Sequence, residues 1–140
     1  VEDSFNYFLH KRHEVIFYDG LIDALKDLST RYELGVLTNG NADIHRLNIG
    51  EYFKFSVSSV DVQSNKPDKE HFQKALDLSG FNSEQVIHIG DHQVNDVMGA
   101  LNIGMKAIWF NKEKVNWEQE VAKPAEIVDW YNYKIIDEIA

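Results

Sequence analysis

Four short apolar runs, separated by amphipathic segments, constrain the fold of this chain more than any other feature. The runs lie at residues 34–38, 55–60, 86–89 and 105–110. Short apolar runs bounded by turn residues are typical of buried strands. The intervening segments at 21–31, 69–79 and 94–103 place their apolar residues on one helical face. Strands that alternate with helices predict an α/β fold with a parallel sheet.

The two ends of the chain carry weaker signals. Residues 1–13 have aromatic residues at helical spacing, and 14–18 form a further apolar run that ends in a turn. Toward the other end, a polar loop or a short helix is expected over 111–121. The same pattern favours an edge strand over 124–128 and a closing helix over 131–140.

Composition excludes several classes of function. A chain of 140 residues can bury a proper core, and its net charge of -9 with no cluster of Lys or Arg argues against nucleic-acid or anionic-membrane partners. The absence of Cys excludes disulfides and Cys-ligated zinc. No apolar run approaches the roughly 18 residues of a membrane span, and no signal-peptide pattern is present, so a cytoplasmic protein is expected.

Two carboxylates follow the apolar run at 86–89. Asp91 lies in the turn after this run, and Asp96 lies in the first turn of the expected helix. Ligands of open α/β sheets bind at this carboxyl end of the strands, and Mg²⁺ is typically held by one or two carboxylates plus substrate phosphate. The pair predicts half of a Mg²⁺ and phosphate site. The alternative is a helix cap and an acidic residue that suits the helix dipole.

Polar residues at two other loops point to the same chemistry. Thr38 ends the run at 34–38 and Asn39 follows it, at a strand end where a hydroxyl and backbone N–H groups can hold a phosphoryl oxygen. A simple turn with a capping Thr or Asn is the alternative. Lys66 precedes the helix that Pro67 opens, near the end that favours an anion. A solvated loop lysine is its alternative.

Three loop motifs occur in order along the chain. They are L-T-N-G at 37–40, N-K-P-D at 65–68 and G-D-H-Q-V-N-D at 90–96. Together they resemble motifs II, III and IV of the haloacid dehalogenase-like (HAD) hydrolases, over about residues 20–110. The resemblance implies a Rossmann-like core and a Mg²⁺-dependent phosphatase that forms an aspartyl-phosphate. The subgroup it resembles most dephosphorylates flavin mononucleotide and riboflavin-pathway phosphates.

The resemblance implies a role for each matching residue. Thr38 would bind the transferring phosphoryl group, Asn39 and Gly40 would supply nearby donors, and Lys66 would neutralise the charge of nucleophile and phosphoryl group. The same likeness makes Asp91 a ligand of Mg²⁺. Asp96 would support the metal shell and the lysine. These residue types suit phosphoryl transfer, in which catalysis is mostly positioning and electrostatic stabilisation.

One family motif has no counterpart in this chain. Motif I is an apolar strand followed by D-x-D-G-T, and the sequence contains no D-x-D; residues 15–23 only imitate it. The family pattern then implies that 1–13 is a remnant of a cap-domain helix and that 14–140 is the C-terminal portion of the core. A central strand, between those ending at Thr38 and Gly90, would be missing. Residues 14–18 or a strand of another chain are expected to fill its place.

Three functions therefore remain open from the sequence. The first is a Mg²⁺-dependent phosphatase of small phosphorylated metabolites, to which this chain contributes but which it does not complete. The second is a haloacid dehalogenase. In dehalogenases motif II usually ends in Ser-Asn, and the Gly-Asp of motif IV is replaced. Thr38 and Asp91 therefore favour the phosphatase. The third is a catalytically inactive HAD-like module that binds a ligand or partner.

Overall fold

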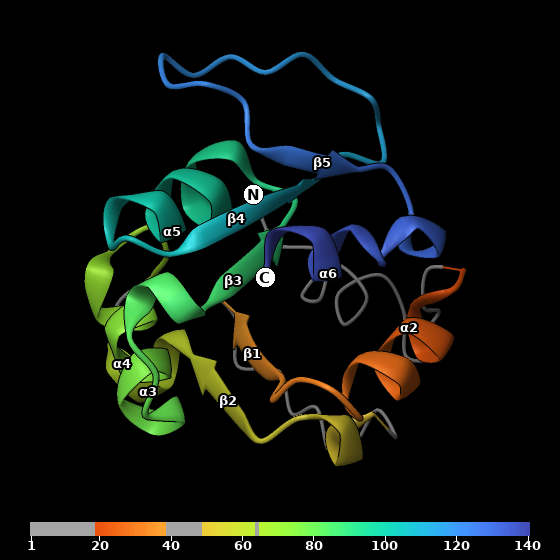
Figure 1. Ribbon diagram of the computed structural model, residues 1–140. Coiled ribbons are helices and arrows are strands. Elements are labelled where there is room, and N and C mark those ends of the chain that lie inside the picture. The colour runs from red at the N-terminus through yellow and green to blue at the C-terminus, as the bar shows by residue number, and fades with distance from the viewer. Residues whose placement is uncertain (1–18, 39–48, 64) are drawn as a thin grey trace, which may run out of the picture.

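Parallel strands form two separate sheets in the computed structural model, which describes residues 19–38, 49–63 and 65–140 (Figure 1). In the first sheet, β1 (Gly35–Thr38) pairs with β2 (Phe55–Ser58). The second sheet has the order β3-β4-β5 and consists of β3 (Ile87–Gly90), β4 (Lys106–Phe110) and β5 (Ala125–Ile127). All three pairings are parallel, which confirms the predicted α/β class.

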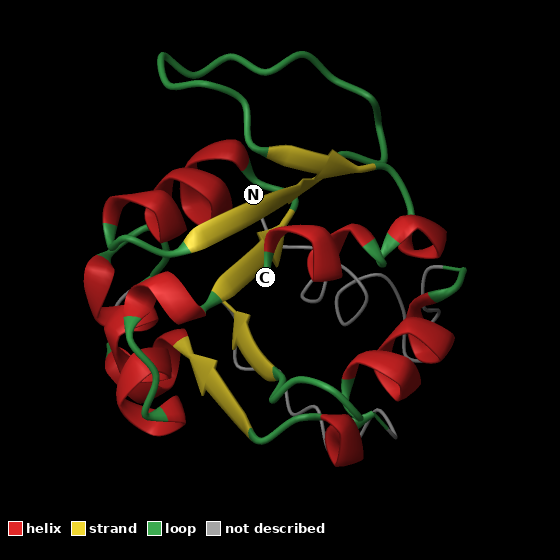
Figure 2. Cartoon of the chain, in the orientation of Figure 1, coloured by secondary structure: helices red, strands yellow, loops and turns green. Residues whose placement is uncertain are grey.

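Helices cover both faces of these strands (Figure 2). One group lies beside β1 and β2 and against β4, and it comprises α3 (Ser59–Val62), α4 (Lys69–Ser79), η4 (Gln93–Met98) and α5 (Gly99–Asn102). The opposite group comprises α2 (Leu21–Leu28), η5 (Trp130–Asn132) and α6 (Ile135–Ile139). Two further short 3₁₀ turns are η2 (Gly50–Tyr52) and η3 (Ser83–Gln85).

Strand β4 shows how the sequence builds these two layers. Successive side chains of a strand point to opposite faces. Ala107 and Trp109 accordingly pack with Phe72 of α4, whereas Ile108 and Phe110 pack with the apolar face of α2. The strand is buried on both faces, so its sequence is almost continuously apolar rather than alternating.

Three elements differ from the sequence-based expectations. The strand expected over 55–60 ends at Ser58 because this side chain accepts the backbone N–H of Asp61, and the Asp61 carboxylate accepts the backbone N–H of Ser58. This reciprocal capping begins α3. The helix expected over 94–103 is divided into the π-helical η4 and the α-helical α5, and the closing helix is divided into η5 and α6.

Several expectations fall on residues that the structure does not describe. These are the helix over 1–13 and the apolar run at 14–18. The proposed division between a cap remnant at 1–13 and a core at 14–140 therefore stays a prediction. Among the residues that are described, no helix has the length and apolar character needed to cross a membrane.

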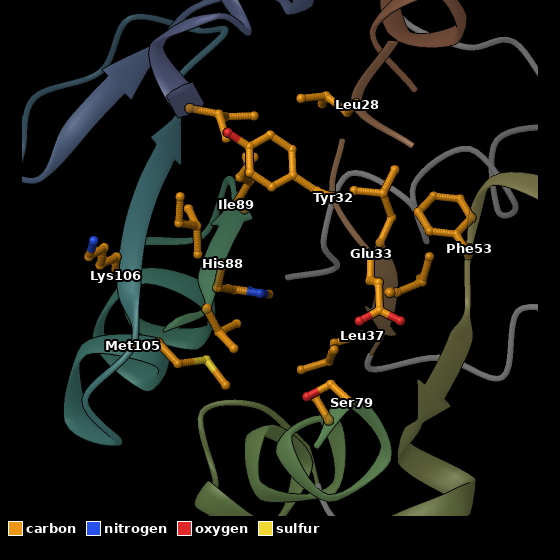
Figure 3. A pocket seen from close by; sticks show the side chains of 18 of the residues that line it. Leu28, Tyr32, Glu33, Leu37, Phe53, Ser79, His88, Ile89, Met105 and Lys106 are labelled. Atoms are coloured by element: carbon orange, nitrogen blue, oxygen red, sulfur yellow. The ribbon is translucent and has the colours of Figure 1, made fainter. Parts of the chain in front are cut away.

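The two sheets face each other across a cavity. Within the described residues, no strand pairs with both β1 and β3, and a cavity of about 700 Å³ is lined by residues of both strands. Figure 3 shows Ile89 and His88 of β3 on one side of this space and Leu37 of β1 on the other. We call this space the interstrand cavity. The strand expected to be missing from the sequence would lie at this place.

Candidate functional site

A buried ion pair lies between the carboxyl ends of β1 and β3. Lys66 Nζ is 2.5 Å from Asp96 Oδ1, and each side chain is only 1% exposed. The same ammonium donates to the backbone carbonyl of Leu37 at 3.4 Å. Lys66 comes from the loop before α4 and Asp96 from η4, so this lysine links β1 to the turn that follows β3. The pair is the electrostatic centre of the candidate site.

The Asp96 carboxylate has further donors besides Lys66. His88 Nε2 lies 3.0 Å from Oδ1, and the backbone N–H of His92 donates to Oδ2 at 3.1 Å. Burial by itself would raise the pKa of Asp96, but the Lys66 ammonium and the hydrogen bond from His88 outweigh it and hold the pKa well below its usual range. Asp96 is therefore a carboxylate at neutral pH.

Gly90, the last residue of β3, leaves space that the Asp96 side chain occupies. A Cβ at position 90 would lie 2.2 Å from Asp96 Cγ, closer than real atoms approach. Any larger residue would displace the carboxylate from Lys66 and His88. The glycine of the G-D-H-Q-V-N-D motif thus leaves room for the side chain of the aspartate six residues later.

Asp91 directly follows β3 and is half-buried. Its backbone carbonyl accepts a hydrogen bond of 3.0 Å from Nε1 of the buried Trp109 on β4. The neighbouring strand therefore holds the main chain at the position predicted to bind a metal. This places Asp91 at the carboxyl end of the sheet, as the sequence predicts.

Thr38 ends β1 and is fully buried. Its neighbour Leu37 contacts the Lys66 ammonium, so the end of β1 belongs to the same site as the Lys66–Asp96 pair. The structure thus brings Thr38, Lys66, Asp91 and Asp96 to the carboxyl ends of β1 and β3. Asn39 and Gly40, the other predicted phosphate ligands, lie outside the described residues.

His88, within strand β3, takes part in the site. Its ring binds Asp96 and stands edge-on to Phe72, with centroids 5.2 Å apart and planes at 87°. The sequence does hold a signal for this contact. Residues two apart in a strand share a face, so His88 lies beside the carboxylate that packs on Gly90.

His92 has a local hydrogen-bonding role at the start of η4. Its Nδ1 accepts the backbone N–H of Asn95 at 2.9 Å and so caps η4. Burial is the main cause that lowers the pKa of His92 below its ordinary value, which favours the neutral ring that this bond requires.

The oxygen donors of the site suit a magnesium ion that is bound partly by protein carboxylates and partly by a phosphate group of the substrate. The described residues contain no cluster of three or more His, Cys, Asp or Glu side chains able to hold a metal on their own. Mg²⁺ usually binds through one or two carboxylates and completes its shell with waters and phosphate oxygens. Asp91 can supply such a carboxylate, and Asp96, which accepts the backbone N–H of the next residue, His92, is held ionised by Lys66.

Comparison with known proteins identifies the family. The model of the haloacid dehalogenase-like hydrolases matches residues 2–110. The 5-amino-6-(5-phospho-D-ribitylamino)uracil phosphatase YigB of Escherichia coli is 32% identical over 91 residues, which are 65% of this chain and 38% of that protein. The chain therefore spans much less than two thirds of this relative.

Solved structures share the fold. A 2-haloacid dehalogenase from Pseudomonas syringae is 36% identical with a TM-score of 0.88, over 98% of this chain and 60% of that one. The HAD-hydrolase YfnB of Bacillus subtilis, described as bound to magnesium, is 26% identical with a TM-score of 0.78, over 94% of this chain and 60% of that one. The matches point to the same family as the order of the three loop motifs and the parallel α/β core. This chain belongs to the haloacid dehalogenase-like hydrolase family.

Proposed function

We propose that this chain is the greater part of the core of a Mg²⁺-dependent phosphatase that acts on small phosphorylated metabolites in the cytoplasm. The observation that carries the proposal is the buried Lys66–Asp96 pair at the carboxyl ends of β1 and β3, beside Thr38. A fixed positive charge in a water-poor site suits the charge that spreads over a transferring phosphoryl group.

Each site residue has a part in this proposal. The Thr38 hydroxyl and the donors of Asn39 and Gly40 hold phosphoryl oxygens, and Lys66 neutralises their charge. Asp91 binds Mg²⁺, which supplies further positive charge to the phosphoryl group when bound. Asp96 orients the lysine, since its carboxylate is the ammonium's partner at 2.5 Å.

The residues at the ends of β1 and β3 favour a phosphatase over a dehalogenase. A halide leaving group needs no divalent metal, whereas the Gly90-Asp91 turn offers a carboxylate suited to Mg²⁺. YigB is named as a phosphatase, and a phosphatase active on riboflavin-pathway phosphates is the finer form of the proposal. Dehalogenation remains the second candidate because the similar Pseudomonas structure is described as a 2-haloacid dehalogenase.

The nucleophile of this reaction is proposed to lie outside the described residues. Asp19 precedes α2 in a turn with Gly20, and it is exposed. It leads into the helix before β1 and has no second aspartate two residues away. We therefore propose that the chain alone is inactive and that an aspartate on a separate strand completes the site.

Two substrates assayed side by side test the proposal. The product of the complete reading frame is incubated with p-nitrophenyl phosphate or 2-chloropropionate, each with Mg²⁺ or with EDTA. Phosphate release that requires Mg²⁺, without chloride release, is expected. Chloride release, or the absence of both activities in a folded protein, would contradict the proposal. The 140-residue chain assayed in parallel should release no phosphate.

A further inference from the structure

The segment that joins β4 to β5 is long and lies beside the candidate metal ligand. Figure 1 shows it as a blue loop that extends beyond β5 at the top of the view. It comprises residues 111–124, and we call it the β4–β5 loop. Segments of this length without a helix or strand are uncommon in compact domains and usually have a function. The loop follows β4, whose carboxyl end is paired with that of β3 and is therefore close to Asp91.

Asn111 fixes the first part of the β4–β5 loop. This residue is only 4% exposed, and its side-chain oxygen accepts the backbone N–H of Val115 at 3.0 Å. Its side-chain nitrogen donates to the Val115 carbonyl at 2.9 Å and to the Glu126 carboxylate of β5 at 2.5 Å. Residues 111–115 therefore close on the side chain that begins them, so the loop leaves β4 in a defined direction.

Gln93 joins the β4–β5 loop to the turn that carries Asp91. Its Nε2 donates to the carbonyl of Asn116 at 2.9 Å, and its Oε1 accepts the backbone N–H of Glu118 at 2.9 Å. The two bonds lie on either side of Trp117, as the bonds from a paired strand would. A side-chain amide supplies both the donor and the acceptor that this arrangement needs. Gln93 therefore fixes the main chain of the loop on both sides of Trp117.

Trp117 carries a second contact from the loop to the same turn. Its ring packs against Trp109 of β4, with centroids 5.3 Å apart and planes at 60°. Its own Nε1 donates to the carbonyl of Val121 at 2.8 Å, which holds the ring within the loop. Trp109 is 1% exposed, and its Nε1 donates to the carbonyl of Asp91 at 3.0 Å. The loop thus reaches the main chain of Asp91 through two indole rings.

The two contacts meet at the main chain around Asp91. Trp109 binds the carbonyl of Asp91 itself, and Gln93 follows Asp91 by two residues. A connection between β4 and β5 by itself requires neither contact. Neighbours that orient a metal ligand through hydrogen bonds typically change metal affinity or activity by about 10- to 100-fold when they are lost.

We propose that Gln93 and Trp117 are positioning residues, through which the β4–β5 loop holds the Asp91 carboxylate where it binds Mg²⁺. The inference rests on the proposed function, in which Asp91 is a ligand of the metal. Since both residues act through Asp91, their loss should weaken Mg²⁺ binding. Turnover at saturating Mg²⁺ should change much less.

Two variants of the complete reading-frame product test the two contacts. Gln93→Met keeps the length of the side chain but removes its amide, and Trp117→Ala removes the ring beside Trp109. Calorimetry without substrate should give a Mg²⁺ dissociation constant that is about tenfold or more higher in each variant. The Mg²⁺ concentration for half-maximal release of phosphate from p-nitrophenyl phosphate should rise by a similar factor. The maximal rate should be recovered when Mg²⁺ saturates the site.

Two matched variants serve as controls. Trp117→Phe keeps an aromatic ring against Trp109, so it should regain most of the Mg²⁺ affinity that Trp117→Ala loses. Glu113→Ala, at an exposed position of the same loop, should bind Mg²⁺ as the unaltered protein does. Loss of stability alone would lower the maximal rate and leave the half-saturating Mg²⁺ concentration unchanged.

The indole N–H proton of Trp109 gives a readout in the metal-free protein. Its NMR resonance is assigned by its loss in Trp109→Phe. In Gln93→Met this proton should exchange faster with solvent, because its bond to the Asp91 carbonyl opens more often. Its exchange rate in Glu113→Ala should equal that of the unaltered protein.

The outcomes separate this proposal from the proposed function. Mg²⁺ affinity that is unchanged in either variant would overturn the positioning role of that residue, even in an active phosphatase. A lower maximal rate with unchanged half-saturation would overturn it as well. An unaltered protein that binds Mg²⁺ but releases no phosphate would contradict the proposed function alone, since calorimetry still measures the effect of the loop. An unaltered protein that binds no Mg²⁺ would overturn both.

Discussion

Lys66 and Asp96 form an ion pair of 2.5 Å in which each side chain is 1% exposed. When two charges are removed from water in this way, the loss of one partner leaves the other buried without compensation, which strongly destabilises the fold. Each partner is also tied to a strand: Lys66 reaches the Leu37 carbonyl of β1, and Asp96 is bound by His88 of β3. The pair therefore connects the stability of the core to the geometry of the candidate site.

Removal of the Asp96 charge should destabilise the chain strongly. Asp96→Asn leaves the Lys66 ammonium buried without its carboxylate, so the free energy of unfolding should fall by about 3–5 kcal/mol. Urea denaturation at neutral pH measures this loss. Asp77→Asn, on the exposed side of α4, should change the free energy by no more than about 0.5 kcal/mol. Equal effects of the two changes would contradict the role of the pair.

Removal of both charges should be less damaging than removal of one. In Lys66→Met with Asp96→Asn, no unpaired charge remains in the core, so the double variant should be more stable than either single variant. A double-mutant cycle by urea denaturation gives the coupling free energy. Simple addition of the two single losses would show that the side chains do not interact as described.

The depressed pKa of Asp96 predicts how stability depends on pH. The folded chain binds the Asp96 proton less readily than the unfolded chain, whose aspartates titrate near about 3.9. The stabilisation that the ionised Asp96 gives to the folded state is fully present above the pKa of the unfolded state. It is lost as the pH falls toward the pKa of the folded state. The stability gap between the unaltered chain and Asp96→Asn should therefore narrow below about pH 4. A gap that stays constant in urea titrations down to acid pH would contradict the assignment.

A methyl group at position 90 should disturb Asp96. In Gly90→Ala the Cβ would lie 2.2 Å from Asp96 Cγ, and the forced shift should cost about 1–3 kcal/mol. The imidazole resonances of His88 should move in NMR spectra, because its bond to Asp96 is broken. Gly80→Ala meets open space and should cost only the left-handed backbone penalty, about 1–2 kcal/mol, without moving His88. Unmoved His88 resonances in Gly90→Ala would refute this packing.

The sequence predicts much of this fold because its local signals agree with one another. Buried strands such as β4 are apolar along their length, and the loops with Thr38, Lys66 and Asp91 each follow or precede a regular element. The Ser58 and Asp61 spacing signals the start of α3, although the apolar Val57 and Val60 favoured a longer strand. The pattern of side chains alone does not decide between these outcomes, since the reciprocal cap depends on backbone geometry.

The contacts within the site were harder to predict. His88 binds Asp96 across the turn at Gly90, and that turn's shape is set by tertiary packing rather than by local preference. The described strands form two sheets, and the central strand that the absent D-x-D motif predicts to be missing would lie between them; its absence stays a prediction. The roles of Asn39 and Gly40 stay predictions because these residues lie outside the described part of the chain.

The most direct test of the account is phosphate release from p-nitrophenyl phosphate by the complete reading-frame product when Lys66 is replaced. Lys66→Met together with Asp96→Asn keeps the core free of unpaired charge, and Lys69→Met, at an exposed position of α4, serves as the control. We predict that the folded double variant loses Mg²⁺-dependent turnover, by about 100-fold or more, while the control retains it. Full turnover in the folded double variant would show that the buried pair is not the centre of the phosphoryl site.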